Sequence, residues 1–420
     1  MKTENIKKHG GKLLAVLALT FLAAVLFRFF VNRASNKPPL THPVIFTKWL
    51  EDNLEEETFN NLINEFEALH DEIRITLSPK LFEELRQTLI NSDKALTEGD
   101  GMFPGDVIVL DPLWIPELLS KEIIESTYTP LISSINVFYY NIEVLKEAGF
   151  SRPPKTRSEV LNCARTLAGR GRDSRESTGN ITSGLAMGLN SSRGIYDDIF
   201  PWLWSAGINL IQDGKPEINS RQVVESLSFF FSLNSEGLIV PGAFSANSEK
   251  KLEDFVSGKA AFMIAPARDI RFVRERMGDE AFGITSIPTP DNYAGKTFFG
   301  ASAWTVGIHT ASAHKEEAKL FADFLAEKAS VFSGFSEHTN AIPGSGVRPS
   351  QDDFHSKVQD IAFAGESAPD FSGLPWTELE KAFKEELAAM FAEKSSSAAI
   401  AAAIQMKWET ILEHWDIVSP

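Results

Sequence analysis

The strongest constraint on the fold is an alternation of strand-like and helix-like segments near the start of the chain. A short apolar strand at 44–46 is followed by apolar residues at helical spacing over 54–69. Alternating residues at 73–77 predict a second strand, 81–89 a second helix, and 106–110 a continuous apolar strand that is buried on both faces. This order, β-α-β-α-β, predicts a parallel sheet with helices on both sides.

A second block of the same kind follows along the chain. Residues 135–140 resemble a strand, and 142–148 resemble a helix that Gly149 closes. Thr156 and Glu159 then form a T-x-x-E capping box, in which side chains satisfy two backbone amides at the start of a helix. Two such blocks suit the length of 420 residues, which predicts two to three domains at roughly 150 residues each.

Charge and cysteine content exclude several classes of function. The chain has 57 acidic and 41 basic residues, and its net charge of −16 creates a field that repels phosphate backbones. We therefore expect no nucleic-acid partner. The single cysteine, Cys163, excludes an internal disulfide and lies on the apolar face of a predicted helix, where it suits the core. We find no metal-ligand spacing, phosphate-binding loop or complete nucleophile motif, so we expect no metal and no cofactor.

The N-terminus carries a targeting or anchoring signal. A lysine-rich start at 1–12 precedes a mainly apolar run at 13–27, and Arg28 can lie at the outer membrane interface. A cleaved signal peptide and an uncleaved membrane anchor both fit residues 1–34. The lack of an A-x-A cleavage site favours the anchor, with its N-terminus in the cytoplasm. Residues 35–43 suit a linker, and we expect the rest of the chain on the periplasmic side of the membrane.

Aromatic residues gather at the places where parallel α/β sheets bind ligands, beyond the carboxyl ends of the strands. Flat aromatic faces stack on the apolar faces of sugars, and a carboxylate accepts hydrogen bonds from hydroxyl groups. The alternative is that the tryptophans are core residues, as we expect for Trp408 and Trp415 on an amphipathic helix. The candidates near strand and helix ends are Trp49, Asp111, Trp114, Phe200, Trp202, Trp204, Phe299 and Trp376.

The order and spacing of several motifs resemble those of one family. Gly105 to Asp111, followed by Trp114, is similar to the third-strand motif of that family. Residues 137–141 resemble the segment in which that family's chain first crosses from one lobe to the other. Residues 258–263 resemble the segment in which it returns. On these motifs the chain resembles the extracellular solute-binding proteins of bacterial ABC importers, in the group that includes maltose-binding protein. The resemblance covers most of residues 44–415.

This resemblance implies an α/β, periplasmic-binding-protein-like fold of two lobes, each a sheet flanked by helices, joined by a multi-strand hinge. The implied first lobe comprises 44–134 and 265–303, and the second comprises 135–264 and 304–420. Ligand then binds between the lobes and favours a closed state, because it touches both of them.

The resemblance also implies which residues bind the ligand. Arg268 stands where sugar binders often carry an aromatic residue, which admits an acidic or sulfated sugar or another anion. The alternative for Arg268 is a surface or hinge ion pair. The positions carried over by motif are Trp49, Asp111 and Trp114 in the first lobe, Phe200 and Trp204 in the second, Phe299 and Ser302 at the last crossing, Trp376 and Arg268.

We therefore expect a monomer that binds a small solute, a carbohydrate, and delivers it to an ABC permease while held by its N-terminal membrane tether. This function involves no catalysis. Two alternatives stay open. An extracytoplasmic carbohydrate-active enzyme would need a second carboxylate about 5 to 10 Å from Asp111. A sensor subunit would use the same cleft to signal a receptor.

Overall fold

The computed structural model describes residues 42–49, 53–92, 103–126, 129–173, 183–328, 353–368, 371, 373–392 and 395–418. The predicted signal or anchor at 1–34 lies outside the described residues, as does the predicted linker up to residue 41. Across the described ranges, no helix combines the length and the apolar character that a membrane span requires.

The first lobe is the predicted parallel sheet with helices packed against it. Its elements are β1 (His42–Trp49), α2 (Asn53–Leu69), β2 (Ile73–Lys80), α3 (Phe82–Asn91), β3 (Val107–Leu110), η1 (Pro112–Trp114), α4 (Ile115–Ser120), β11 (Ala301–Ile308) and α12 (Lys315–Glu327). Strand β1 pairs in parallel with β2 and β3, so the β-α-β-α-β prediction is confirmed. Phe46 of β1 and Phe66 of α2 both contact Phe321 of α12, with ring centroids 5.2 and 5.0 Å away.

The second lobe is a sheet with apolar residues on both faces. Its elements are β4 (Thr129–Asn141), α5 (Ile142–Glu147), α6 (Arg157–Asp173), β5 (Ser183–Ala186), α7 (Gly194–Asp198), α8 (Phe200–Trp204), α9 (Arg221–Ser235), α10 (Ser248–Val256), β8 (Ala260–Pro266), η2 (Ala267–Asp269), α11 (Ile270–Met277), β9 (Phe282–Thr285) and α15 (Asp353–Ala364). Phe138 stacks on Phe262 at 5.1 Å, whereas its neighbour Tyr139 points to the other face and stacks on Phe282 at 6.2 Å. Successive β4 residues therefore serve two separate cores.

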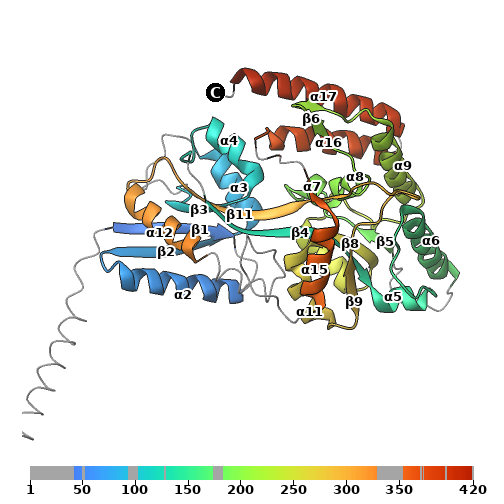
Figure 1. Cartoon of the computed structure of the whole chain (residues 1–420), viewed down its shortest axis with the longest axis horizontal. Coiled ribbons are helices and arrows are strands. Elements are labelled where there is room, and N and C mark those ends of the chain that lie inside the picture. The colour runs from blue at the N-terminus through green and yellow to red at the C-terminus, as the bar shows by residue number, and fades with distance from the viewer. Residues whose placement is uncertain are drawn as a thin grey trace, which may run out of the picture.

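Strand β4 joins the two lobes. Over 129–135 it pairs antiparallel with β11 of the first lobe, and over 136–141 it pairs antiparallel with β8 and β9 of the second. The strand order β2-β1-β3-β11-β4-β8-β5 makes one continuous ladder through both lobes. In Figure 1, β4 and β11 run side by side across the middle of the molecule.

Two long C-terminal helices lie along one edge of the molecule (Figure 1). Helix α16 (Trp376–Phe391) packs on α7 and α9 of the second lobe and on η1 and α4 of the first. It therefore touches both lobes. The remaining elements are β6 (Ile211–Gln212), β7 (Lys215–Pro216), β10 (Phe298–Phe299), β12 (Glu366–Ser367), α16 (Trp376–Phe391) and α17 (Ser397–Val418).

Strand pairing places two segments differently from the predicted lobe ranges. Strand β9, within the range 265–303 predicted for the first lobe, pairs with β4 in the second. Residues 305–308 of β11, predicted in the second lobe, pair with β3 of the first. The reason is that β11 lies antiparallel between β3 and β4, so the chain has returned to the first lobe before residue 301.

The predicted start of helix α6 is present with one change of partner. Thr156 Oγ1 accepts a hydrogen bond from the Glu159 amide at 3.4 Å, as a capping box requires. Glu159 Oε2 accepts from the Lys155 amide at 2.7 Å, one residue before the expected position. Cys163 further along α6 is 2% exposed, which confirms its place in the core.

Gly105 allows the start of β3 to approach β1. Its φ is 120°, and a Cβ atom there would lie 2.4 Å from Thr47 Oγ1. Gly149 also has a positive φ, 89°, but a Cβ atom there would have nothing within 4 Å. We expect Gly105→Ala to lower the free energy of unfolding by about 1–3 kcal/mol more than Gly149→Ala, because only the first adds overpacking to backbone strain. Urea denaturation of both variants measures the difference, and equal losses would contradict this account of β3.

Candidate functional site

Two carboxylates and one guanidinium meet between the lobes. Asp111 follows β3 of the first lobe, and its Oδ2 lies 2.7 Å from Nη1 of Arg193, which precedes α7 of the second. Arg193 also pairs with Asp197 at 3.1 Å. These side chains are at most 8% exposed, so each charge depends on its neighbours for compensation.

The local chain geometry fixes both partners of this pair. Asp111 is the N-cap of η1, where its Oδ1 accepts from the Leu113 amide at 2.9 Å. Burial alone would lower the pKa of Arg193, but the carboxylates of Asp111 and Asp197 raise it above its usual range. Burial would likewise raise the pKa of Asp197, and the Arg193 cation instead holds it below its usual range. Arg193 and Asp197 are therefore both ionised at neutral pH.

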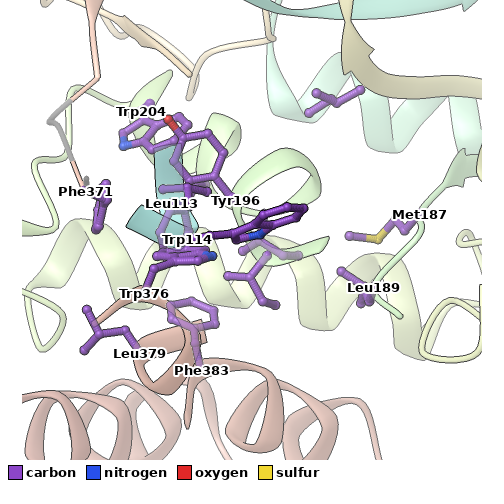
Figure 2. Packing of buried hydrophobic residues seen from close by; sticks show 14 of the residues in the cluster. Leu113, Trp114, Met187, Leu189, Tyr196, Trp204, Phe371, Trp376, Leu379 and Phe383 are labelled. Atoms are coloured by element: carbon purple, nitrogen blue, oxygen red, sulfur yellow. The ribbon is translucent and has the colours of Figure 1, made fainter. Parts of the chain in front are cut away.

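An aromatic cluster surrounds this charged centre. The guanidinium carbon of Arg193 lies 4.6 Å from the Tyr196 ring centroid. Tyr196 meets Trp204 at 5.0 Å and Trp376 at 5.6 Å, both edge to face. Figure 2 shows these rings together with Trp114 in one packed group. Rings from the first lobe, the second lobe and α16 thus share one site.

Two indole groups in this cluster have no hydrogen-bond partner in the part of the chain that the structure describes. Among the described residues, no acceptor is bonded to Nε1 of Trp204 or Trp376, although both side chains are buried. Trp408 on α17 differs, because its Nε1 donates to the Leu379 carbonyl at 2.9 Å. A buried donor without an acceptor costs free energy, and a ligand oxygen can remove that cost.

The hinge strand touches the site directly. Asn136 of β4 donates from Nδ2 to Asp197 Oδ1 at 3.0 Å, and its amide donates to the Gly300 carbonyl at 3.0 Å. Gly300 in turn leaves room for Trp204, since a Cβ atom there would lie 2.4 Å from the ring. A rotation of one lobe about β4 would therefore change the contacts of both the charged centre and the aromatic cluster.

Helix α16 adds a buried carboxyl group beside the charged centre. Glu380 is 6% exposed, and its Oε1 accepts from the Ile195 amide at 3.2 Å. Burial raises its pKa to about 8, against the opposing effects of the Ile195 amide, Lys384 and the two nearby arginines Arg86 and Arg193. Most Glu380 carboxyl groups are therefore protonated at neutral pH, and this acid adds little charge to the site.

The structure brings five of the predicted binding residues together. Phe200 contacts both Trp204 and Trp376 at 5.6 Å, which places it in the same cluster. Trp202 instead packs on Phe229 at 4.9 Å, deep in the second lobe. The predicted residues that share the site are Asp111, Trp114, Phe200, Trp204 and Trp376.

The other four predicted residues are placed elsewhere or only by their backbone. Phe299 is half-buried against the core that contains Tyr139 and Phe282, although its strand β10 also contacts α8. The Arg268 amide donates to Ser134 Oγ at 3.2 Å beside the hinge strand. In the strand ladders, Trp49 pairs with Lys80 and Ser302 pairs with Ser134. The side chains of Trp49 and Ser302 lie outside the described part of the chain.

Sequence reasoning missed the residues at the centre of the site. Arg193 and Asp197 are four positions apart with Tyr196 between them, a spacing that becomes informative only once α7 is known. Asn136 lies inside a strand pattern, and Glu380 lies inside a helix pattern, so neither stands out by type or position. The pairing of Asp111 with Arg193 spans 82 residues and has no local signal.

Comparison with known proteins identifies the family. The model of the bacterial extracellular solute-binding proteins matches residues 52–331. The chain belongs to this family. A Brucella abortus (strain 2308) protein described as a binding protein is 23% identical over 309 residues, which cover 71% of this chain and 72% of the relative.

Two solved structures show the same fold. The GacH receptor of Streptomyces glaucescens, solved unliganded and with acarbose, has a TM-score of 0.71 at 17% identity, over 89% of this chain and 99% of its own. An ABC transporter solute-binding protein of Thermotoga lettingae, bound with alpha-D-tagatose, has the same TM-score and identity, over 89% of this chain and 100% of its own. The predicted periplasmic-binding-protein-like fold is confirmed.

Family membership also fixes the coarse function. Members are extracellular solute-binding proteins, so this chain binds a solute outside the cytoplasm. The charged and aromatic site between the lobes is where such a fold brings groups from both lobes together. The family and the two structural relatives are binding proteins rather than enzymes.

The raised pKa of Glu380 predicts a specific pH dependence. Its folded pKa of about 8 exceeds the ordinary value of 4.5, so the folded protein holds this proton more tightly than the unfolded chain. Its contribution to stability is therefore greatest below the unfolded pKa and is lost as pH rises toward 8. We expect Glu380→Gln to remove this decline, because glutamine keeps the acceptor oxygen without the charge.

Thermal and urea unfolding between pH 5 and pH 8.5 measures this effect. Glu378→Gln is the matched control, since Glu378 is exposed in the first turn of the same helix. We expect the stability difference between Glu380→Gln and wild type to grow with pH, and that of the control to stay nearly constant. Parallel pH profiles for all three proteins would contradict the raised pKa.

Proposed function

We propose that this solute-binding protein is the binding component of an ABC importer and that its ligand is a carbohydrate. The observation that carries the proposal is the meeting of Asp111, Arg193 and several aromatic rings between the lobes. Aromatic rings stack on sugar faces, while the carboxylate and guanidinium groups bond to hydroxyls. The sugars bound by the GacH receptor and the Thermotoga lettingae protein support this ligand class.

The charge balance of the site favours a neutral sugar over an acidic one. Arg193 is the cation at the centre, and it is already compensated by Asp111 and Asp197. An anionic ligand entering there would meet two carboxylates for one guanidinium, and like charges at short range in a dry site are costly. Arg268 lies beside the hinge strand, next to Ser134, which supports its alternative role as a hinge residue.

We extend the proposal to the membrane. Residues 13–31 would tether the monomer to the outer face of the cytoplasmic membrane, near its permease, and the basic start at 1–12 would stay inside. Mass spectrometry of the N-terminus of the mature protein tests this. An intact Met1 or Lys2 supports the tether, and a mature start near Ser35 overturns it in favour of a cleaved signal.

A thermal-shift screen of the purified chain tests the ligand class. The panel contains neutral mono- and oligosaccharides, acidic and sulfated sugars, amino acids, polyamines and inorganic anions. A ligand at 100 times its Kd should stabilise the protein by about 2.7 kcal/mol, a shift of several degrees. We expect shifts from neutral sugars, with no product on chromatography. A shift from anions alone, or sugar turnover, would overturn the proposal.

Tryptophan-to-phenylalanine variants test the site with a matched control. Trp376→Phe removes an indole N–H that has no partner among the described residues, whereas Trp408→Phe removes one bonded to Leu379. We expect Trp376→Phe to weaken sugar affinity about 5- to 20-fold with a smaller loss of stability. Trp408→Phe should lose about 1–3 kcal/mol more stability and keep its affinity. Isothermal titration and urea unfolding measure both, and unchanged affinity in Trp376→Phe would contradict the assignment of this indole to the ligand.

A further inference from the structure

One short segment of the second lobe, Ser192–Arg193, bonds to side chains of two different elements of the first lobe. The Ser192 amide donates to Oε1 of Glu83 in α3 at 2.6 Å. The next residue, Arg193, forms the 2.7 Å ion pair with Asp111. Two carboxylates on different elements of the first lobe therefore hold two consecutive residues of the second. Both contacts are direct, and neither needs a ligand.

We propose that the Glu83–Ser192 and Asp111–Arg193 contacts form an interlobe latch, which holds this solute-binding protein closed when no ligand is bound. Both bonds carry a charge on one or both partners, and such bonds are stronger than neutral ones. The Asp111–Arg193 pair is buried, so only a narrow range of positions compensates the loss of hydration of the two charges. Burial also reduces the screening of the pair by salt. Together the two bonds fix both the position and the rotation of the second lobe against the first.

Helix α16 forms hydrogen bonds with both lobes next to the latch. Thr377 donates to Glu117 Oε2 at 2.7 Å and accepts from Arg86 Nη2 at 2.9 Å, so α16 is bonded to α4 and α3 of the first lobe. Glu380, one turn later, accepts from the Ile195 amide of the second lobe. The segment Ser192–Ile195 is thus bonded to Glu83 of α3, to Asp111 after β3, and to Glu380 of α16.

The latch can open without leaving a buried charge unpaired. Arg193 has a second carboxylate, Asp197, within its own lobe, at 3.1 Å. Asp111 keeps the Leu113 amide, and opening exposes its other oxygen to water. Buried ion pairs gain little net free energy, because separation restores hydration. The pair therefore specifies the closed geometry, and Glu83, which is nearer to solvent, supplies an independent part of the closing free energy.

A latch of this kind changes how ligand binds. A binding-competent open state that is only a fraction of the population reduces the apparent affinity by that fraction. Ligand then binds only after the lobes have opened spontaneously. This consequence rests on the proposed function, but the existence of the latch does not, because it concerns the ligand-free protein.

Distance measurement between two spin labels tests the latch. Gln87→Cys on α3 and Ser228→Cys on α9 place labels at exposed positions on the two lobes. The native Cys163 is buried, and burial raises its pKa to about 11, so it reacts slowly; Cys163→Ala removes it from the background. Double electron–electron resonance on the ligand-free full chain then gives the closed and open populations.

The decisive variant is Glu83→Ala, with Glu84→Ala as its matched control. Both residues are in the first turn of α3, so both substitutions change helix propensity and the helix dipole alike. Glu84 bonds to Lys80 within the first lobe, at 2.8 Å. We expect a mainly short distance in wild type and in Glu84→Ala, and an open-to-closed ratio raised roughly ten- to a hundredfold in Glu83→Ala.

Glu83→Gln keeps an acceptor oxygen and should fall between Glu83→Ala and wild type. Circular dichroism checks that all variants are folded. A mainly long distance in ligand-free wild type would overturn the latch, and so would equal distributions in Glu83→Ala and Glu84→Ala. Because no ligand is added, these outcomes are independent of whether the sugar screen succeeds.

Discussion

The backbone ladder of β4 is the constraint on which the rest of the structure depends. Its first half pairs with β11 in one lobe, and its second half pairs with β8 and β9 in the other. Neither lobe can complete its sheet without this strand, so the lobes can rotate about β4 but cannot separate. Asn136, where the pairing changes lobe, is also bonded to Asp197. Any motion at the hinge is thereby coupled to the charged centre.

The charged centre explains why these lobes meet in one geometry. Apolar packing between Trp114, Tyr196 and Trp376 is non-directional and would tolerate several rotations. A buried guanidinium shared by Asp111 and Asp197 tolerates very few while the lobes stay in contact, because a charge displaced inside the closed interface loses its partner and gains water only when the lobes move apart. Hydrophobic burial therefore supplies much of the free energy of contact, and the ion pairs select the arrangement.

The sequence predicts elements better than it predicts the site. The strands and helices follow from periodicity and caps, which are local. Trp114 was a candidate because it follows a strand, Trp204 because it lies in an aromatic group around Pro201, and Trp376 because it starts a helix. Arg193 was missed because its ion-pair partner Asp111 lies 82 residues away in the sequence. Its ring partner Tyr196 is placed by a five-residue helix that has no clear sequence pattern. The lobe ranges failed at β9 and β11, because pairing order in a sheet follows from tertiary packing. The pairing of Phe299 with Ser367, which joins β10 to β12, also has no local signal in the sequence.

The latch acts on the ligand-free protein together with two indole groups, those of Trp204 and Trp376, that have no hydrogen-bond acceptor among the described residues. In the described structure, where the Glu83 and Asp111 bonds are formed, both indole N–H groups are buried without an acceptor. Each buried donor without a partner costs about 1–3 kcal/mol. Under the proposed function, the hydroxyl oxygens of a bound sugar would remove this cost by accepting hydrogen bonds from these N–H groups. Such a ligand would then favour the arrangement in which these groups find acceptors, because a ligand shifts a conformational equilibrium only by its differential affinity for the two states.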